Sequence, residues 1–325
     1  MKRKLVTIQK VSKLEPIEGA DFIEKATVMG WNVVVKKGEF KEGDKCCFFE
    51  IDSLLPSGPE WSAFMEKVKF RVKTCKLRGV LSQGLALPTS VLPGSDLLDE
   101  GTEVTEELGV TKWEPPTKLA PNAKGNFPSF IPKTDEIRLQ SAMGVIEEIN
   151  AVDCYISLKM DGSSLTAFMQ DGELGVCSRN LMLKEEDSAF WRVVNRYKLK
   201  EKLREGMAIQ GELCGPGIQG NKLNLKEHDL FVFNLFNIKE GKYMGFYDMH
   251  TCVLNMGLKL VPLLKPPEEP LTLESLLELA RGKYEGTQNH REGLVVRPVH
   301  ETYSPTLGGR LSFKVINNDY LLKEK

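Results

Sequence analysis

The chain has 325 residues, which predicts two domains, and its 41% hydrophobic and 27% charged content is ordinary for a globular protein. No apolar run is long enough for a transmembrane helix, and no apolar segment follows the basic start at residues 1–4, so we expect a cytoplasmic protein, or a nuclear one if the host has a nucleus. The formal net charge of −1 excludes an overall basic nucleic-acid-binding protein, and the scattered, odd-numbered set of 7 cysteines argues against a zinc site or a disulfide framework.

The first third of the chain is predicted to be all β. Residues 26–35 are rich in β-branched and apolar side chains and are interrupted at Gly30, and residues 46–51 form the next expected strand. Several short strands separated by glycine turns fit a small barrel such as an OB-fold. We therefore place an OB-like β-barrel domain at residues 1–112 and expect it to contact nucleic acid.

One basic segment of this domain predicts such a contact. Cations alternate with apolar residues over 67–73, and the cations are Lys67, Lys69, Arg71 and Lys73. If the segment is a strand, its cations lie on one face and could follow a phosphate backbone. The alternative is an ordinary solvated face, but four charges of one sign without a carboxylate favour nucleic acid.

The rest of the chain is predicted to be a linker and a second domain. Residues 113–132 are rich in Pro, Lys, Asn and Gly and lack periodicity, as is typical of a linker. Thr134 is expected to cap a helix that runs to Met143. The domain at 133–325 then mixes strands with helices, which favours an antiparallel α+β fold. The expected strands are 152–158, 165–169, 207–213, 230–238, 293–298 and 311–316, and the clearest helices are 188–202 and 271–281.

The strand at 152–158 delivers Lys159 to a turn made by Asp161 and Gly162. A lysine at a strand end beside a carboxylate is a candidate nucleophile. Its amine is protonated at the ordinary pKa of about 10.4, but burial and neighbouring cations can lower that pKa and free the lone pair. The alternative is a solvated lysine beside a turn.

Further polar residues stand at strand ends. Arg179 lies in a turn, where its planar guanidinium could clamp a phosphate or a ribose, or simply face solvent. Glu212 ends an apolar strand and is either paired, placed on a metal, or exposed. Glu292 opens another apolar strand and could instead form a surface ion pair with Arg291.

Two more residues stand out from apolar runs. Phe233 lies in an aromatic-rich strand that is either core or, at this position, a platform for a base. Lys314 interrupts an apolar run between Phe313 and Val315. A lysine there is costly unless it faces a cleft, an anion or solvent.

These residues follow one another in a definite order: Lys159-x-Asp161-Gly162, Ser178-Arg179, Gly211-Glu212, Phe233, Glu292-Gly293 and Lys314. This order resembles the covalent nucleotidyltransferase superfamily of ATP-dependent ligases and mRNA capping enzymes. Segments 127–135 and 211–221 look specifically like RNA ligases. An OB-like domain placed before the catalytic domain is similar to the RNA ligase family with an N-terminal OB-fold, and the resemblance covers essentially the whole chain.

The resemblance implies an ATP-dependent RNA ligase that joins a 3′-hydroxyl to a 5′-phosphate. Lys159 would attack the α-phosphorus of ATP and carry AMP, which would then move to an RNA 5′-phosphate and leave when the 3′-hydroxyl attacks. The expected partner is RNA, as a nicked duplex in RNA repair, with no membrane and with a monomeric protein.

The resemblance also implies roles for the other residues. Asp161, Glu212 and Glu292 would orient a hydrated Mg²⁺ or Mn²⁺, which would neutralise phosphate charge and lower the pKa of Lys159. Lys314 would hold the α-phosphate. The implied catalytic set is Lys159, Asp161, Glu212, Glu292 and Lys314, and the implied nucleotide-binding set is Lys159, Arg179, Phe233, Glu292 and Lys314, with Arg179 on the ribose or a phosphate and Phe233 on adenine.

One departure and three alternatives bear on this interpretation. Related enzymes often carry two alternating lysines in the last motif, and here the first of these positions is Ser312. A capping guanylyltransferase or a DNA ligase would use the same lysine chemistry, but those enzymes usually place the OB domain after the catalytic one, and only residues 317–325 follow the last motif. A catalytically inactive, OB-containing RNA-binding protein would be expected to have lost Lys159 or a carboxylate.

Overall fold

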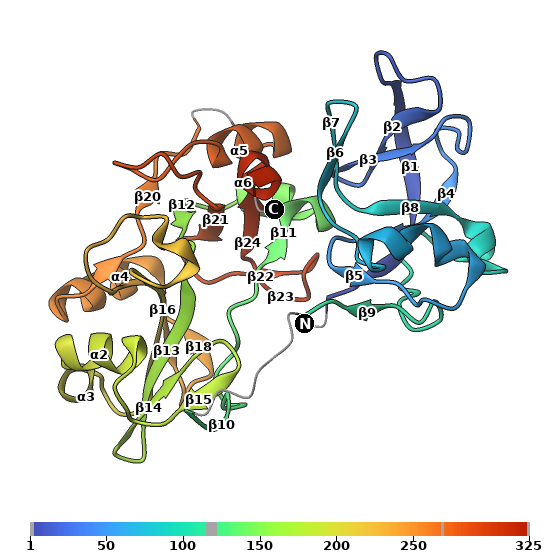
Figure 1. Cartoon of the computed structure of the whole chain (residues 1–325). Helices are drawn as coiled ribbons and strands as arrows, with labels where there is room; N and C mark the ends of the chain where they lie inside the picture. Colours follow the sequence, from blue (N-terminus) through green and yellow to red (C-terminus); the bar gives the residue numbers. More distant parts are fainter. Residues whose placement is uncertain (1–2, 115–121, 268–269, 324–325) are drawn as a thin grey trace. The chain divides into compact units, whose positions relative to one another are not determined.

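The computed structural model describes residues 3–114, 122–267 and 270–323 (Figure 1). The chain forms two compact units. The N-terminal unit contains the described residues up to 114 together with 139–143, and the C-terminal unit contains residues 122–138 and the described residues from 144 onward. Of the segment expected to be a linker, residues 115–121 lie outside the described part, and Ala123–Asn126 form a strand of the C-terminal unit.

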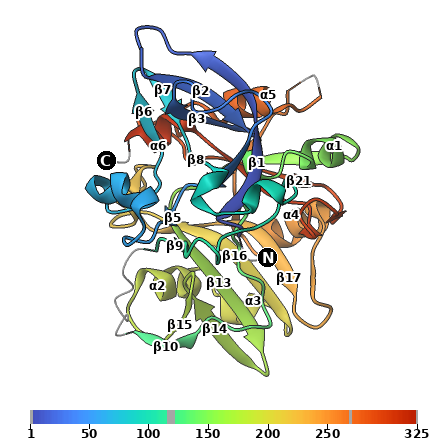
Figure 2. The same ribbon diagram turned by 90° about the vertical axis from the view of Figure 1, so that its right-hand side faces the viewer.

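The N-terminal unit is built on an antiparallel sheet with the strand order β3-β2-β1-β4-β8. The strands of the unit are β1 Val6–Pro16, β2 Ile23–Val28, β3 Trp31–Lys36, β4 Lys45–Phe49, β5 Ser53–Leu54, β6 Cys75–Leu77, β7 Val80–Ser82, β8 Leu85–Pro88 and β9 Thr111–Lys112. Strand β1 pairs with β4 through its first half and with β2 through its second half (Figures 1 and 2). The register shifts between Val11 and Lys13, and such a bulge bends a strand, so the sheet curls around the buried Trp31 and Phe48.

The basic segment 67–73 is not a strand, and that prediction was wrong. Residues Glu60–Val68 form a 3₁₀ helix, and Lys69 and Phe70 follow with left-handed φ angles of 53° and 57°. Arg71 turns inward, where its guanidinium pairs with Asp52 at 2.6 Å and lies 3.3 Å from the ring centroid of Trp113. Phe70 and Val72 pack on the unit's core, whereas Val68 is exposed, and the turn breaks the single row of cations that a strand would have made.

The C-terminal unit contains two larger sheets. An eight-stranded sheet has the order β10-β15-β14-β13-β16-β17-β18, with β19 paired to β17, and a five-stranded sheet has the order β11-β24-β21-β12-β20. The strands are β10 Ala123–Asn126, β11 Ile137–Arg138, β12 Cys154–Lys159, β13 Ser163–Gln170, β14 Glu173–Cys177, β15 Leu181–Leu183, β16 Met207–Cys214, β17 Asp229–Asn237, β18 Lys242–Tyr243, β19 Lys259–Leu260, β20 Leu263–Leu264, β21 Gly293–Pro298, β22 Tyr303–Ser304, β23 Gly309–Arg310 and β24 Phe313–Ile316.

Short helices accompany these sheets: α1 Val145–Asn150, α2 Ala189–Arg196, α3 Leu199–Lys202, α4 Phe246–Asn255, α5 Leu273–Ala280 and α6 Asn318–Lys323. Helix α5 begins with a capping box between Thr272 and Ser275. The helix expected over 188–202 is divided into α2 and α3 because Lys198 has a left-handed φ of 54°. A mainly hydrophobic core lies between the eight-stranded sheet and its helices, with Trp191, Leu213 and Val253 among its members.

The helix expected from Thr134 to Met143 is absent, and that prediction was wrong. Ile137 and Arg138 instead form β11, which pairs in parallel with Phe313 and Lys314 of β24. The hydrogen bonds of a sheet edge thus outweigh the local capping preference. This pairing also places the segment 135–138 beside the last sequence motif.

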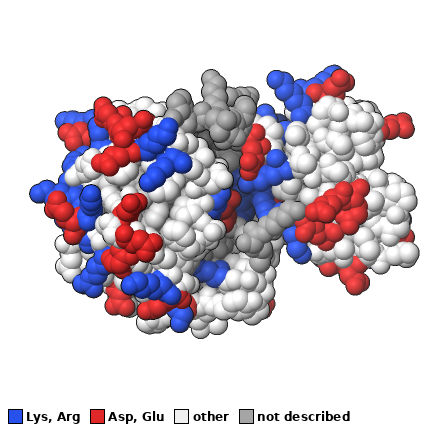
Figure 3. Space-filling model, turned by 90° about the horizontal axis from the view of Figure 1, so that it is seen from below, with Lys and Arg blue, Asp and Glu red and all other residues white. Residues whose placement is uncertain are grey.

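Two surface properties bear on partners. None of the helices in the described part of the chain has the length and apolar character needed to cross a membrane. On the face shown in Figure 3, acidic and basic side chains are interspersed over the C-terminal unit. An RNA contact on that face therefore depends on local groups, as the net charge of −1 also indicates.

Candidate active site

Strand register places Lys159 and Lys314 on one face of the five-stranded sheet. Lys159 on β12 pairs with Gly293 on β21, and two residues further along β21 Val295 pairs with Lys314 on β24. Directly paired residues, and residues two apart on one strand, point to the same side. The parallel pairing of Arg138 with Lys314 adds a third cation to this face. Arg138 was not predicted from the sequence.

Lys159 forms an ion pair with Glu292, with 2.7 Å between Nζ and Oε1. Their side chains are 25% and 19% exposed, so solvent and solutes reach both. Burial alone would lower the pKa of Lys159, but the carboxylates of Glu292, Glu212 and Asp161 together raise it. Without a bound cation, the candidate nucleophile is therefore held as an ammonium.

The hydroxyl of Tyr284 forms hydrogen bonds with the backbones of both Lys159 and Glu292. The Tyr284 hydroxyl donates to the carbonyl of Lys159 at 3.0 Å and accepts from the backbone N–H of Glu292 at 3.2 Å. Arg291 does not pair with Glu292, because its guanidinium donates instead to backbone carbonyls at the end of α5, at Leu279, Ala280 and Arg281. The alternative of a surface ion pair for Glu292 is thus replaced by the pair with Lys159.

Glu212 lies near the end of β16 on the neighbouring sheet and accepts a hydrogen bond from the backbone N–H of Gly162. Burial, together with the negative charge of Glu292 and Asp161, raises the pKa of its carboxyl to about 7, although Lys159 opposes the shift. Three carboxylates therefore crowd around one lysine, and a cation bound there would relieve their repulsion.

Asp161 is buried and accepts from two side chains that the sequence did not indicate. Its Oδ2 lies 3.0 Å from the Tyr320 hydroxyl and 2.9 Å from Nζ of Lys222. The Lys222 ammonium also lies 4.2 Å from the ring centroid of Tyr320. The carboxylate is thus held in place by helix α6 and by the loop that follows β16.

Lys314 and Arg179 share one carboxylate. Nζ of Lys314 lies 3.4 Å from Oδ1 of Asp135, and Nη2 of Arg179 lies 3.2 Å from Oδ2. Burial and the nearby cations Lys159 and Arg138 lower the pKa of Lys314 to about 8, while Asp135 opposes this. Asp135 therefore links the exposed Arg179 to the group around Lys159, a connection absent from the sequence pattern.

Phe233 is the extra residue of a β-bulge. Gln210 pairs with Asn234 and the next residue, Gly211, pairs with Val232, so Phe233 has no partner across the ladder. Bulges beside active sites often change the direction of a side chain. Phe233 is only partly buried and packs on the cluster that contains Leu158, the residue before Lys159 on β12.

Each motif carboxylate has a glycine beside it, and each glycine lies where a Cβ would collide with the neighbouring strand. A Cβ would lie 2.4 Å from the Leu213 carbonyl oxygen at Gly162, 2.7 Å from that of Phe231 at Gly211, and 2.1 Å from that of Val315 at Gly293. These approaches explain why the pattern requires glycine at all three positions.

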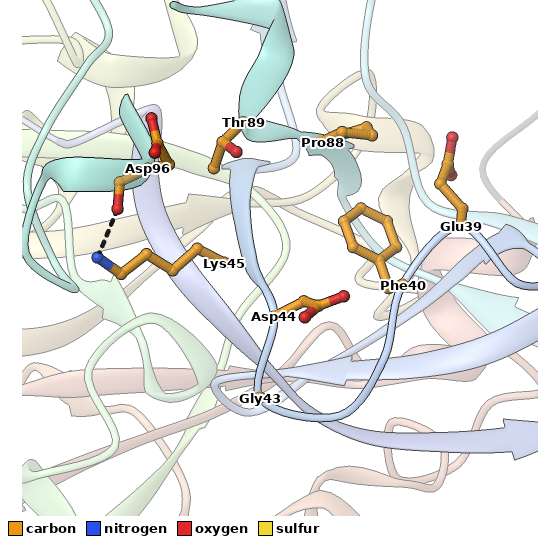
Figure 4. A pocket seen from close by; sticks show the side chains of 8 residues that line it. All are labelled: Glu39, Phe40, Gly43, Asp44, Lys45, Pro88, Thr89 and Asp96. Carbon is orange, nitrogen blue, oxygen red and sulfur yellow. Dashed lines mark hydrogen bonds between the residues drawn. The ribbon is translucent and has the colours of Figure 1, made fainter. Parts of the chain in front are cut away.

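The cations predicted to contact nucleic acid lie in the other unit. Lys67, Lys69 and Lys73 are exposed, and among the residues described their ammonium groups make no ion pair or hydrogen bond. The pocket in Figure 4, of about 400 Å³, also lies in the N-terminal unit and contains none of the predicted site residues. Its lysine, Lys45, donates to the carbonyls of Asp96 and Leu98 at 2.8 and 2.7 Å.

Comparison with known proteins identifies the class. A model of the RNA ligase family matches residues 152–316, and a model of an OB-fold domain matches residues 5–89. The RNA ligase of Naegleria gruberi, solved with PPi, has a TM-score of 0.87 and 38% sequence identity over 98% of both chains. A lysine-to-alanine mutant of that enzyme with ATP and Mn, and a glutamate-to-alanine mutant with AMP and Mn, each give a TM-score of 0.88 and 38% identity over 98% of both chains. A comparison with curated proteins found no match.

The matched domains define an α+β nucleotidyltransferase unit preceded by an OB-like β unit, as the sequence predicted. The chain belongs to the RNA ligase family, in the group with an N-terminal OB-fold domain. The family resemblance and the fold class inferred from the sequence are thereby confirmed.

Proposed function

We propose that this RNA ligase uses ATP to seal nicks in duplex RNA and serves in RNA repair. The observation that supports the chemistry best is the 2.7 Å pair between Lys159 and Glu292, inside a group whose charges act on one another: Asp161, Glu212 and Lys314. The Naegleria gruberi enzyme has been solved with ATP and Mn, with AMP and Mn, and with PPi, which fits a nucleotide-transfer site. Its solved variants also include a lysine and an aspartate two positions apart, the spacing of Lys159 and Asp161.

The first step follows from the position of Lys159. Nζ first loses a proton to solvent, and the neutral amine then forms a bond to the α-phosphorus of ATP. The bond from that phosphorus to the bridging oxygen breaks, pyrophosphate leaves with the electron pair, and a second proton leaves the nitrogen for solvent. Lys314, on the same sheet face, neutralises the α-phosphate oxygens. Arg179 reaches the ribose or a phosphate once it separates from Asp135, and Phe233 stacks on adenine.

The second and third steps use the same site. An oxygen of the RNA 5′-phosphate attacks the adenylate phosphorus, the bond to Nζ of Lys159 breaks, and Nζ keeps the electron pair and takes up a proton. The RNA 3′-hydroxyl then attacks the 5′-phosphorus, loses its proton, and AMP leaves. Tyr320 and Lys222 keep Asp161 in position throughout.

The carboxylates Asp161, Glu212 and Glu292 fit a divalent cation held largely through water. The raised pKa of Glu212, which burial and the two like charges produce, indicates a site short of positive charge. In the described part of the chain, however, no three His, Cys, Asp or Glu side chains gather closely enough to ligate one ion directly. Mg²⁺ retains several of its waters, so contacts through water are consistent with this spacing. The bound ion would supply charge neutralisation of the phosphates.

A sealing panel tests the proposed substrate. We expect joining of a nicked RNA duplex with ATP and either Mg²⁺ or Mn²⁺, and much less joining of free single strands or of blunt breaks. Duplexes with DNA on either side of the nick measure the tolerance for DNA at each end. Equal joining of single strands would contradict the nick proposal, and covalent labelling by GTP but not by ATP would favour a capping-type guanylyltransferase.

A separate prediction concerns the exposed lysines of the N-terminal unit, which we propose contact the RNA backbone. The double substitution Lys69→Glu and Lys73→Glu should weaken RNA binding by about tenfold at low salt, and should reduce the slope of log affinity against log salt by roughly one per lost phosphate contact. Covalent labelling by ATP should change little. Arg71 is left intact because its charge already pairs with Asp52.

The matched control is Lys36→Glu with Lys37→Glu, which makes the same charge change elsewhere in that unit. If the control and the test variant bind RNA with equal affinity and salt dependence, the contact at 67–73 is not specific to that segment. If the test variant also loses ATP labelling, the change has damaged the enzyme more generally.

A further inference from the structure

The bulge in β17 sets the direction of the Phe233 side chain, and a buried arginine contacts the residue at this bulge. The guanidinium of Arg297, on β21, donates to the Phe233 carbonyl from Nη1 at 3.5 Å, and its Cζ lies 5.7 Å from the centroid of the Phe233 ring. Only 2% of Arg297 is exposed. The arginine thus contacts both the backbone and the ring of the residue that we place against the base, while it is itself shielded from solvent.

Two further side chains determine where the guanidinium lies. Nη2 of Arg297 donates to Glu136 at 2.8 Å, and Nε donates to the Ser312 hydroxyl at 3.0 Å. Glu136 precedes β11, and Ser312 precedes β24, so the arginine links three neighbouring strands. Burial favours protonation of Glu136, but Arg297 and Arg310 hold the pKa of its carboxyl below the ordinary value, and the pair remains ionised.

The residues that flank the bulge are also connected. The Asn234 amide donates to Gln210 at 3.1 Å, and its oxygen accepts from Arg310 at 2.9 Å. Gln210 in turn donates to the Pro132 carbonyl at 2.9 Å. Polar groups therefore secure both sides of the bulge, and the flanking Gln210 and Asn234 are almost fully buried.

Ser312 stands where related enzymes often have a lysine. A lysine side chain there would meet the guanidinium of Arg297, and the two cations would share the single carboxylate Glu136. A serine instead accepts from the arginine. The serine at position 312 is thus compatible with the arginine on the adjacent strand, because it offers the guanidinium a small acceptor.

We propose that Arg297, held by Glu136 and Ser312, is a positioning residue that maintains the bulge at Phe233 and the angle of its ring toward the nucleotide base. The inference rests on the proposed stacking of Phe233 on adenine. It assigns the buried arginine a role in ATP affinity rather than in the transfer of AMP, because the guanidinium contacts Phe233 and not the group around Lys159.

The test separates this role from a purely structural one. Breaking a buried ion pair by removing one partner is strongly destabilising, whereas replacing both partners with apolar residues of similar size is often neutral. The double variant Glu136→Leu with Arg297→Met should therefore keep a melting temperature close to that of the wild type. Its KM for ATP in covalent adenylylation should nevertheless rise about tenfold, while the maximal rate falls much less, since stacking of a base on an aromatic ring contributes a factor of roughly 5 to 150.

A double-mutant cycle with Phe233→Ala identifies the path of the effect. If Arg297 acts through Phe233, adding Phe233→Ala to the double variant raises KM no further than Phe233→Ala alone, because residues that act through one contact are not additive. Independent effects that multiply, or an unchanged KM in the double variant, would overturn the proposal. If Phe233→Ala itself leaves KM unchanged, the proposed stacking fails, and the positioning role fails with it.

Two controls complete the experiment. The exposed pair Asp187 and Arg192 in the same unit, changed to Leu and Met, should leave KM for ATP unaltered. Ser312→Ala removes one bond to the guanidinium and should raise KM about threefold without loss of the fold, in line with a modest hydrogen-bond contribution. Should the double variant not fold, Ser312→Ala decides the matter, and an unchanged KM in that variant would count against the proposal.

Discussion

Lys159→Ala is expected to abolish covalent labelling of the protein by ATP, a loss on the order of 10⁴-fold or more, as is typical when a nucleophile is removed. The amine of Lys159 pairs with Glu292, and the negative charge of the surrounding carboxylates raises its pKa. The measurement is transfer of label from ATP labelled at the α-phosphate. Lys200→Ala, on the exposed side of α3, is the control and should label normally.

Lys159→Arg distinguishes nucleophilicity from charge. A guanidinium can keep the ion pair with Glu292, but it stays protonated at all working pH values and cannot attack phosphorus. We therefore expect a folded protein with a wild-type melting temperature and no adduct. Both variants should still seal a nick whose 5′ end already carries AMP, because the lysine is needed only to form and transfer that adenylate. Labelling of Lys159→Arg would place the nucleophile elsewhere.

Much of the catalytic unit was predictable because its strands are strongly patterned. Residues 207–213 and 293–298 are mainly apolar segments of strand length, and each contains a glycine. The structure forms strand β16 over the first segment and strand β21 over the second. The motif positions at Glu212 and Glu292 follow from the same property, since Glu212 lies near the end of β16 and Glu292 directly precedes β21. A neighbouring glycine marks the close approach of the next strand.

The partners of these residues were not predictable, because they are distant in sequence and lack a periodic pattern. Asp135 reaches Lys314 across 179 positions, and Tyr320 reaches Asp161 across 159. Lys222 lies in a loop of ordinary polar composition. Only the parallel pairing of β11 with β24 brings the segment of Asp135 to the last motif, and that pairing was hidden by an apparent helix cap at Thr134.

The prediction of a strand over the basic segment 67–73 was wrong for a different reason. Alternation over seven residues has the period of a strand, but the chain enters a left-handed turn at Lys69 and Phe70, and neither residue type favours that conformation. Phe70 and Val72 pack on the core of the N-terminal unit, and the turn at Lys69 and Phe70 is compatible with this packing. The prediction that the four cations lie on one face was therefore wrong, and Arg71 pairs with Asp52, whereas the contact of Lys67, Lys69 and Lys73 with nucleic acid stays a prediction.

Gly293→Ala should produce the largest loss of stability among the glycine variants of the site. An added Cβ would lie 2.1 Å from the Val315 carbonyl oxygen and 2.9 Å from the Cα of Ile316, and both contacts are with backbone atoms that cannot rotate away. Strands β21 and β24 would have to separate beside Glu292 and Lys314. Overpacking of this kind costs on the order of 3 kcal/mol, or roughly 6 to 12 °C in melting temperature for a unit of this size.

The control is Gly309→Ala on β23, where an added Cβ meets no atom within 4 Å. That change should alter the free energy of unfolding by less than about 0.5 kcal/mol and leave ATP labelling intact. For Gly293→Ala, labelling should fall further than the loss of folded protein explains, because the separation of β21 from β24 moves Glu292 relative to Lys314. Thermal unfolding measured in parallel with the labelling rate checks both statements, and equal behaviour of the two variants would mean that the close approach of these strands does not organise the active site.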